Sequence, residues 1–396
     1  MISAKDGATR NPMILKSITY SQFVGEPREW GIEQLCLGQV NLLVGENASG
    51  KTHALNTING LAKILSASVK LAYSSGHYDL IFEGATESTN YILNYDKTAV
   101  SKEVLRVGNR VLLSRGEGGV GKIFAKGMNT DMEFQSPVDE LAAVSRRDSI
   151  QHPFFQPLYD WASNLHHYSF GTEMGKRRLA VFVKKDKDDE LDFDPRDPDK
   201  IVATYRKGFD NVGEPFRKAI MEDMAAIGYD LEDVGVGAPV SVTIKQTLSG
   251  PPVGIFVKEK SLSGVTDQID MSQGMWRALC VLIQINYAEM TGRPSCVLID
   301  DIGEGLDFRR SCALIDLLMQ KAKRSAVQLV MATNDRFVMN QVPLEAWSIL
   351  VRHGGRAKVY NYQNSRERFE QFKLTGLNNF DFFATDFVQG GDARDA

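Results

Sequence analysis

The sequence predicts an α/β fold, and three segments carry this prediction. Residues 40–44 form an apolar run that leads into a glycine-rich segment, residues 45–52, and then into a segment of helical character. Residues 295–299 form a second apolar run, which ends in two aspartates. Residues 330–332 form a third, which is followed by a Thr-Asn pair. Apolar runs that end in polar residues and alternate with helices are typical of the strands of an α/β fold.

The glycine-rich segment, GENASGKT, has the residues of a phosphate-binding loop. Gly45 and Gly50 permit a tight backbone, whose N–H groups converge on phosphate oxygens at the start of the next helix. Lys51 can reach the β- and γ-phosphates, and the Thr52 hydroxyl can bind Mg²⁺. We therefore assign nucleotide binding to Gly45, Asn47, Ala48, Ser49, Gly50, Lys51, Thr52 and His53.

A second segment, residues 116–122, fits almost the same pattern but ends in Ile123, which cannot bind Mg²⁺. It lies between the apolar runs 111–113 and 123–125, which are typical of two paired strands. We interpret this segment as a hairpin turn.

The two aspartates after the second apolar run supply the acidic half of the predicted site. Asp300 is expected to hold Mg²⁺ together with Thr52, and Asp301 to orient or deprotonate the attacking water. Two acids after a strand can also cap the next helix, but their pairing with a phosphate loop favours the catalytic interpretation.

The segment Ser272-Gln273-Gly274 stands just before a long apolar segment that predicts a buried helix. Taken alone, a Ser-x-Gly triplet is a weak signal, and an ordinary helix N-cap explains it. Its place in the chain, between the phosphate loop and the acidic pair, makes it informative.

The order of these segments resembles that of an ABC-type ATPase head. The resemblance implies a P-loop NTPase fold with ATP and Mg²⁺ as cofactors. It implies that Ser272, Gln273 and Gly274 form the signature, which caps the γ-phosphate of ATP bound to a second subunit. Two heads then close as a homodimer, or a higher homo-oligomer, around ATP. The resemblance gives Asp307 the D-loop role and Asn334 the switch position, and makes Asp301, Asn334 and Lys51 the catalytic residues.

Among such heads the chain is most similar to stand-alone bacterial AAA-type, SMC-like ATPases related to the OLD (overcoming lysogeny defect) family. Several of these serve antiphage defence, which implies a separate effector protein, a nuclease or toxin, as partner. Two positions depart from the ABC pattern. Asp301 stands where Glu is usual, and Asn334, where transporters have His, cannot accept a proton as imidazole does. We therefore expect slow ATP hydrolysis.

The rest of the chain is predicted to elaborate one ABC-type head of residues 1–396. The nucleotide-binding core is expected in residues 11–75 and 262–365. Residues 76–130 contain short alternating runs and predict an antiparallel β subdomain. Residues 131–261 predict a mostly helical insert, with an acidic loop at 184–200 that lacks the features of a calcium loop. The tail, residues 366–396, is aromatic, and is expected to dock on the head or on a partner.

Composition limits the class of protein. With 43% hydrophobic residues in 396, the chain can bury a sizeable core. Four scattered cysteines and the absence of a signal segment or spanning run predict a cytoplasmic protein without a membrane role. The net charge of -4 argues against a uniformly basic nucleic-acid surface, although a local basic patch would still allow a nucleic-acid partner.

Three interpretations stay open from the sequence. The leading one is an ATP-gated dimeric switch, and the first alternative is a DNA-binding repair or chromosome-maintenance ATPase. The second alternative is an ATP-bound scaffold with negligible turnover. The adjacent pair His166 and His167 is expected on a helix in a structural role, since no carboxylate or cysteine spacing supports a metal site.

Overall fold

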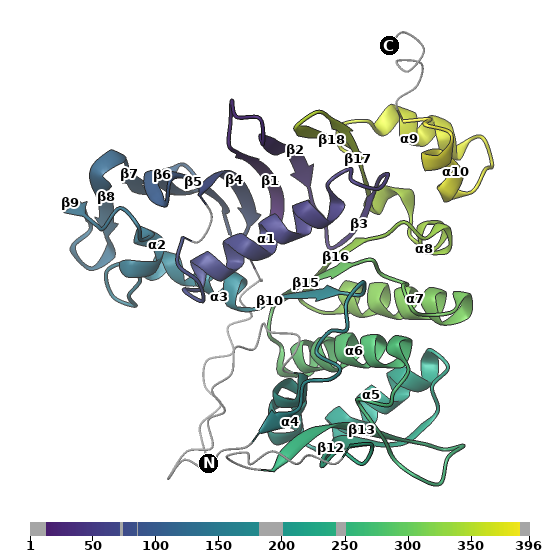
Figure 1. Ribbon diagram of the computed structural model, residues 1–396. Helices are drawn as coiled ribbons and strands as arrows, with labels where there is room; N and C mark the ends of the chain where they lie inside the picture. Colours follow the sequence, from purple (N-terminus) through teal and green to yellow (C-terminus); the bar gives the residue numbers. More distant parts are fainter. Residues whose placement is uncertain (1–12, 72–73, 85, 182–200, 243–250, 389–396) are drawn as a thin grey trace. The chain divides into compact units, whose positions relative to one another are not determined.

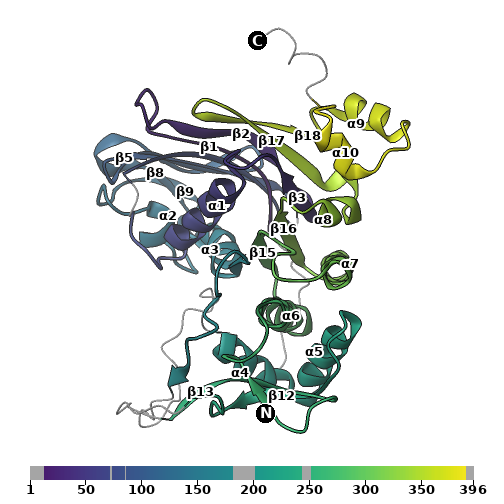
Figure 2. The same ribbon diagram turned by 45° about the vertical axis from the view of Figure 1, so that its right-hand side comes forward.

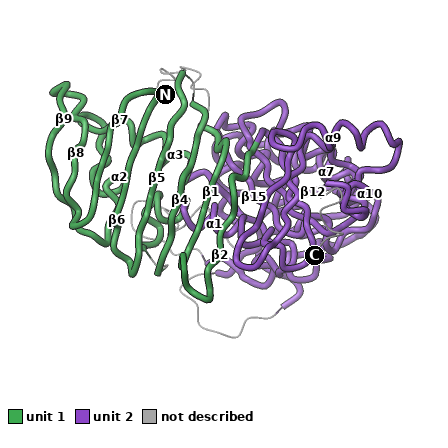
Figure 3. Tube along the Cα trace, turned by 90° about the horizontal axis from the view of Figure 1, so that it is seen from above, with its two compact units in different colours: residues 1–37, 62–162 green, residues 38–61, 163–396 purple. Residues whose placement is uncertain are grey.

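The computed structural model describes residues 13–71, 74–84, 86–181, 201–242 and 251–388. The chain divides into two compact units, shown in different colours in Figure 3. Unit 1 comprises residues 1–37 and 62–162, and unit 2 comprises residues 38–61 and 163–396. Each unit is described separately below.

Unit 1 is dominated by antiparallel strands in the order β2-β1-β4-β5-β6-β7-β8-β9 (Figure 1). Buried and exposed residues alternate along β4, as expected of strands with one face in the core. The strands are β1 (Ile14–Gln22), β2 (Trp30–Cys36), β4 (Ser75–Glu83), β5 (Ser88–Asp96), β6 (Ala99–Val107), β7 (Arg110–Arg115), β8 (Val120–Ala125) and β9 (Thr130–Gln135). Two short helices follow, α2 (Ala142–Ser145) and α3 (Gln156–Ser163).

The second glycine-rich segment is a hairpin connection, as predicted. It joins β7 to β8, and Leu113 pairs with Ile123 across the turn. Gly118 and Gly119 have φ of 68° and 78°, in the left-handed region that favours glycine. A Cβ at Gly119 would lie 2.0 Å from the Ser136 carbonyl oxygen, so there is no room for a side chain at this position. These glycines therefore serve the turn.

Unit 2 is built on parallel strands in the order β10-β15-β16-β3-β17, with β18 antiparallel to β17. The strands β15 and β16 are buried along their whole length, which explains their continuous apolar sequences. The bounds are β3 (Val40–Val44), β10 (Leu165–Ser169), β15 (Ser295–Asp300), β16 (Val327–Ala332), β17 (Trp347–His353) and β18 (Arg356–Asn361).

The helices of unit 2 cover these strands. Helix α1 (Lys51–Leu65) follows the glycine loop, and α6 (Gln273–Thr291) is buried from Gly274 to Ala288. Figure 2 shows α6 and α7 (Phe308–Arg324) beside β15 and β16, with α4 (Ile201–Val212) and α5 (Glu214–Ala226) beyond α6. A helix that is buried on all sides, such as α6, needs neighbours on every side.

The described residues of 131–261, which exclude 182–200 and 243–250, are a mixture of helices and strands and not mostly helical as expected. Helices α4 (Ile201–Val212) and α5 (Glu214–Ala226) are accompanied by β11 (Ala180–Val181), β12 (Leu231–Gly237) and β13 (Pro252–Glu259), and β13 also pairs with β14 (Thr266–Asp267). Strand β10 from the same stretch belongs to the parallel sheet beside β15. The acidic loop predicted at 184–200 lies outside the described residues.

His166 and His167 lie on strand β10 and not on a helix, which corrects the prediction. His166 is buried, with Nε2 3.0 Å from the Gln284 amide, and His167 Nδ1 lies 3.4 Å from the Asn59 amide. The described residues contain no cluster of three or more His, Cys, Asp or Glu that could hold a metal ion. The contacts of His166 with Gln284 and of His167 with Asn59 agree with a structural role for both histidines.

The C-terminal segment packs on unit 2. After β18 come helices α9 (Arg366–Lys373) and α10 (Asn379–Ala384), whose Phe369, Phe372 and Phe382 are buried in the unit's core. Phe380 N donates to Asn340 Oδ1 of α8 (Arg336–Gln341) at 2.8 Å. Within the described ranges, no helix is both long and apolar enough to span a membrane.

Candidate functional site

The glycine loop joins the end of β3 to the start of α1. Ala48 and Gly50 have φ of 63° and 105°, so the backbone turns through the left-handed region twice. Gly45 is fixed by close approach, because a Cβ there would lie 2.5 Å from Ser49 Oγ and 2.6 Å from the Leu350 carbonyl oxygen. The loop therefore has the tight backbone that a phosphate cradle requires.

Lys51 is buried with its ammonium group turned onto the loop. Its Nζ donates to the carbonyl oxygens of Gly45 at 2.7 Å and Glu46 at 3.0 Å. Burial lowers the pKa of Lys51, while the nearby charges of Asp301 and Asp300 act to raise it. The cation thus lies near both acids at the mouth of the loop.

The other loop residues differ in exposure. Ser49 is buried, and its Oγ has no hydrogen-bond partner among the described residues. Thr52 is exposed in the first turn of α1. His53 is half-buried, and burial, together with the charge of Arg352, lowers its pKa. A neutral imidazole is therefore favoured at His53.

Asp300 and Asp301 occupy the end of β15. Asp300 is 2% exposed, and within the described structure its Oδ1 has no hydrogen-bond partner. A buried carboxylate oxygen without a partner is costly unless a cation or donor binds it. Asp301 has φ of 52°. Burial and the negative charge of Asp300 raise the pKa of Asp301, while the positive charges of Lys51 and Arg277 act to lower it.

The parallel register gathers these residues at one edge of the sheet. Ile299 pairs with Met331, and Met331 with Leu42, so β15, β16 and β3 end at the same edge. Just beyond β16, Asn334 Nδ2 donates to Asn47 Oδ1 of the loop at 2.8 Å. The loop, the acids and Asn334 are therefore brought together as the sequence predicts.

The residues at this edge fit a nucleotide with Mg²⁺. The Thr52 hydroxyl and the unpartnered Asp300 carboxylate oxygen are the hard oxygen ligands that Mg²⁺ prefers. Lys51 and the start of α1 offer the positive charge and backbone N–H groups that phosphate oxygens accept.

The predicted signature and D-loop residues lie at two helix starts. Ser272 is the N-cap of α6, and its Oγ accepts from Met275 N at 3.2 Å. Asp307 is the N-cap of α7 and accepts from Arg310 N at 3.1 Å; this bond is the main cause of its lowered pKa. The ordinary capping interpretation of Ser272 is therefore confirmed as local structure.

The signature does not reach the glycine loop of its own chain through any hydrogen bond between described residues. Gln273 Nε2 instead donates to the Thr172 carbonyl oxygen at 3.0 Å. Ser272 remains exposed to solvent. Gly274 is buried, so Ser272 is the most exposed of the three signature residues.

Several neighbours of Asp301 were missed by the sequence analysis. A Cβ at Gly171, just beyond β10, would lie 3.1 Å from Asp301 Oδ2 and 3.5 Å from Glu304 Oε2. Phe170 N donates to the Asp300 carbonyl oxygen at 2.9 Å. Arg277 of α6 contributes positive charge to Asp301. These contacts could not be predicted, because β10 was expected in a helical region. Its sequence, LHHYS, shows only weak alternation of apolar and polar residues.

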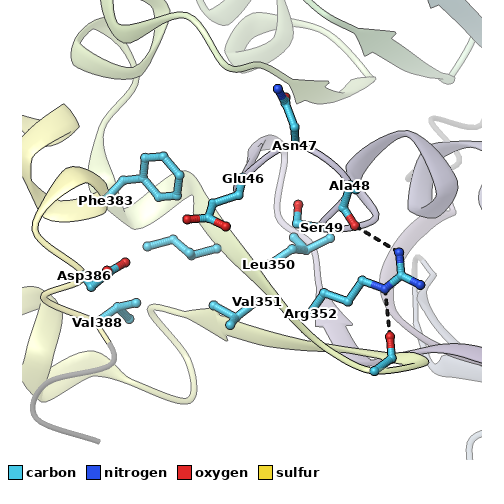
Figure 4. Close-up of a pocket in the computed structure, with 12 residues that line it drawn as sticks. Glu46, Asn47, Ala48, Ser49, Leu350, Val351, Arg352, Phe383, Asp386 and Val388 are labelled. Atoms are coloured by element: carbon cyan, nitrogen blue, oxygen red, sulfur yellow. Dashed lines mark hydrogen bonds between the residues drawn. The ribbon is translucent and has the colours of Figure 1, made fainter. Parts of the chain in front are cut away.

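A pocket of about 410 Å³ adjoins the glycine loop (Figure 4). Its walls are residues 46–49, the end of β17 and the C-terminal segment with Phe383, Asp386 and Val388. Arg352 braces this wall, because its guanidinium donates to the carbonyl oxygens of Ala48 at 3.3 Å and Gly354 at 2.8 Å. The loop is therefore open to a ligand on this side as well.

Comparison with known proteins identifies the fold. No protein-family model matches the chain, and no curated protein matches it. Among solved structures, an SMC head bound to the C-terminal winged-helix domain of ScpA matches with a TM-score of 0.51 and 12% identity, over 87% of this chain and 97% of that one. A Pyrococcus furiosus SMC head domain with an extended coiled coil, bound to the C-terminal domain of ScpA, matches with a TM-score of 0.51 and 11% identity, over 91% of this chain and 100% of that one.

A Thermotoga maritima SMC head domain matches with a TM-score of 0.43 and 14% identity, over 88% of this chain and 98% of that one. The two SMC heads bound to ScpA domains match with TM-scores of 0.51, and at 11–12% identity they establish the fold alone. The chain therefore has the α/β fold of an SMC head domain.

Proposed function

We propose that this chain binds ATP with Mg²⁺, hydrolyses it slowly and closes as a head-to-head homodimer. One observation carries the proposal: Lys51, the acids Asp300 and Asp301, and Asn334 meet at one sheet edge, where a buried carboxylate oxygen lacks a partner among described residues. A purely structural cluster would be expected to bond that oxygen.

Each residue has a chemical role in this proposal. Lys51 exchanges its two carbonyl partners for phosphate oxygens, and the N-terminus of α1 adds backbone N–H donors. Thr52 and Asp300 hold the magnesium ion, which supplies positive charge to the transferring phosphoryl group. Asp301 orients the attacking water and accepts its proton, and Asn334, at the same sheet edge, serves as a hydrogen-bond donor.

The slow rate follows from two side chains. Asp301 is one methylene shorter than the Glu usual in ABC heads, which places its carboxylate farther from the water. Asn334 already donates to Asn47, and an amide cannot take up a proton as a histidine can. Both features favour a long-lived ATP-bound state.

The dimer follows from the exposed positions of the remaining predicted residues. Ser272 and Asp307, the N-caps of α6 and α7, are exposed to solvent and carry a hydroxyl group and a carboxylate. We assign these groups to the ATP bound by a second copy. The resemblance to defence ATPases adds a separate effector, a nuclease or toxin, that the closed dimer controls.

Mass photometry combined with phosphate release tests this proposal. Asp301→Asn should keep ATP binding, lose turnover and accumulate as an ATP-dependent dimer, whereas Lys51→Ala should remain monomeric with and without ATP. An Asp301→Asn protein that stays monomeric with ATP contradicts the dimer. Wild-type turnover equal to that of Lys51→Ala, with the dimer retained, would instead support an ATP-bound scaffold.

A further inference from the structure

We propose that Arg277 is a positioning residue that couples the signature segment, residues 272–274, to Asp301 of the same chain. The inference rests on the proposed function, in which the signature contacts the ATP of a second copy. Its consequence is that engagement of the partner's nucleotide adjusts the hydrolytic site of the engaging subunit.

Arg277 lies one turn beyond the signature on α6 and is 5% exposed. Its Nη1 donates to the Glu304 carbonyl oxygen at 2.8 Å, and its Nη2 donates to the Thr172 carbonyl oxygen at 3.1 Å. The Glu304 carboxylate lies 4.0 Å from Nη2. The planar guanidinium thus holds two backbone segments at once, which a lysine ammonium matches poorly.

These two segments are the ones that flank Asp301. Glu304 N donates to the Asp301 carbonyl oxygen at 3.1 Å, which closes a turn that begins at Asp301. On the other side, Gly171 precedes Thr172, and a Cβ on it would lie 3.1 Å from Asp301 Oδ2. A shift of either carbonyl therefore moves the surroundings of the Asp301 carboxylate.

The packing between the signature and this turn leaves no slack. A Cβ at Gly274 would lie 2.3 Å from the Gly305 carbonyl oxygen. A Cβ at Gly305, where φ is 80°, would lie 2.4 Å from Arg277 Nη1. Because these atoms are in close contact, movement of Gly274 or Arg277 displaces the turn at Gly305.

Gln273, within the signature itself, makes a second connection to the same segment. Gln273 Nε2 donates to the same Thr172 carbonyl oxygen as Arg277, at 3.0 Å. The Thr172 carbonyl is thus held from the signature itself and from the following turn of α6. Arg277 alone also reaches Glu304, so it is the residue that joins both flanks of Asp301.

The test compares Arg277→Lys with Arg217→Lys, a half-buried arginine of α5 that binds Glu214 and Asp233 away from these segments. Arg277→Lys should bind a fluorescent ATP analogue within about twofold of wild type and still form the ATP-dependent dimer. Its kcat should fall about tenfold or more with KM little changed, since small misplacements of a catalytic group cost this much. Arg217→Lys should keep the wild-type kcat.

A second pair of variants guards against misfolding of Arg277→Lys. Gly305→Ala pushes a methyl group onto Arg277 Nη1, whereas Gly376→Ala places one at a similar φ of 71° with nothing within 4 Å. Gly305→Ala should lose turnover per dimer, and Gly376→Ala should not. Wild-type kcat in folded Arg277→Lys or in Gly305→Ala overturns the coupling. A wild-type protein without ATP-dependent dimer or turnover instead overturns the proposed function itself.

Discussion

Two buried clusters of charge, one in each unit, differ in how completely their polar atoms are bonded. In unit 1, Glu103 and Arg115 form an ion pair of 3.3 Å with both side chains fully buried. Glu103 also accepts from Tyr91 Oη at 3.0 Å and from Ala142 N and Ala143 N at 2.8 and 2.9 Å. Only Nε of Arg115 lacks a partner among the residues described in this cluster.

In unit 2, the cluster around Lys51 contains several buried polar atoms that are not hydrogen-bonded. Asp300 Oδ1, Ser49 Oγ and Arg277 Nε are buried without hydrogen-bond partners in the described part of the chain. Lys51 binds loop carbonyls rather than a counter-ion. A bonded cluster stabilises its unit, whereas an incompletely bonded one marks a place where a ligand completes the bonding.

The largest stability effect is expected in unit 1. Glu103→Ala leaves the Arg115 guanidinium buried without its counter-ion and should lower the free energy of unfolding by about 3–5 kcal/mol. Urea unfolding measures this change, with the exposed Glu133→Ala on β9 as control. ATP affinity of the folded fraction should be unchanged. A loss below about 1 kcal/mol would show that the cluster does not hold unit 1 together.

The corresponding change in unit 2 should affect chemistry and leave stability nearly intact. Lys51→Ala removes the loop's cation and should lower ATP turnover about 100-fold or more, as does removal of a transition-state donor in other enzymes. Its urea midpoint should stay close to wild type, since the lost bonds go only to loop carbonyls. Wild-type turnover in this variant would contradict the comparison.

A bonded carboxylate within unit 2 should behave like the cluster of unit 1. Burial acts to raise the pKa of Asp267, but hydrogen bonds from Ser241, Val240 and Ile269 outweigh it and lower the pKa. Asp267→Asn should cost about 1.5–3 kcal/mol of stability at neutral pH. Because the folded pKa lies below the ordinary 3.8, the difference from wild type should persist above that pH and vanish as the pH falls through the folded value. A pH-independent difference would contradict this assignment.

A smaller loss of stability than at Glu103 or Asp267 is expected at Ser272. Ser272→Ala removes the cap of α6 and should cost about 1 kcal/mol. Turnover should fall more than this loss of stability explains, because the hydroxyl is also assigned to the partner's ATP. Thermal unfolding and phosphate release on the same samples separate the two effects. Equal turnover in variant and wild type would leave Ser272 as a cap only.

The core of the site was predictable from sequence because buried parallel strands have continuous apolar sequences. The runs at β3, β15 and β16 end directly at the loop, the acids and Asn334. Strand β10 was assigned to a helical region, since five residues with two histidines give no clear period. Arg277 could not be predicted as a link, because its partners are the carbonyls of Thr172 and Glu304, which leave no trace in side-chain patterns.

The central claim, that each site is completed by a second copy, is tested most directly by mixing two inactive variants. Ser272→Arg blocks the signature but keeps its own loop, and Lys51→Ala disables the loop but keeps its signature. Each alone should be inactive, and an equimolar mixture should recover ATP turnover, since only a mixed dimer holds one complete site, made of the loop of Ser272→Arg and the signature of Lys51→Ala. A mixture as inactive as its components, or a Ser272→Arg protein that is active alone, would contradict the account.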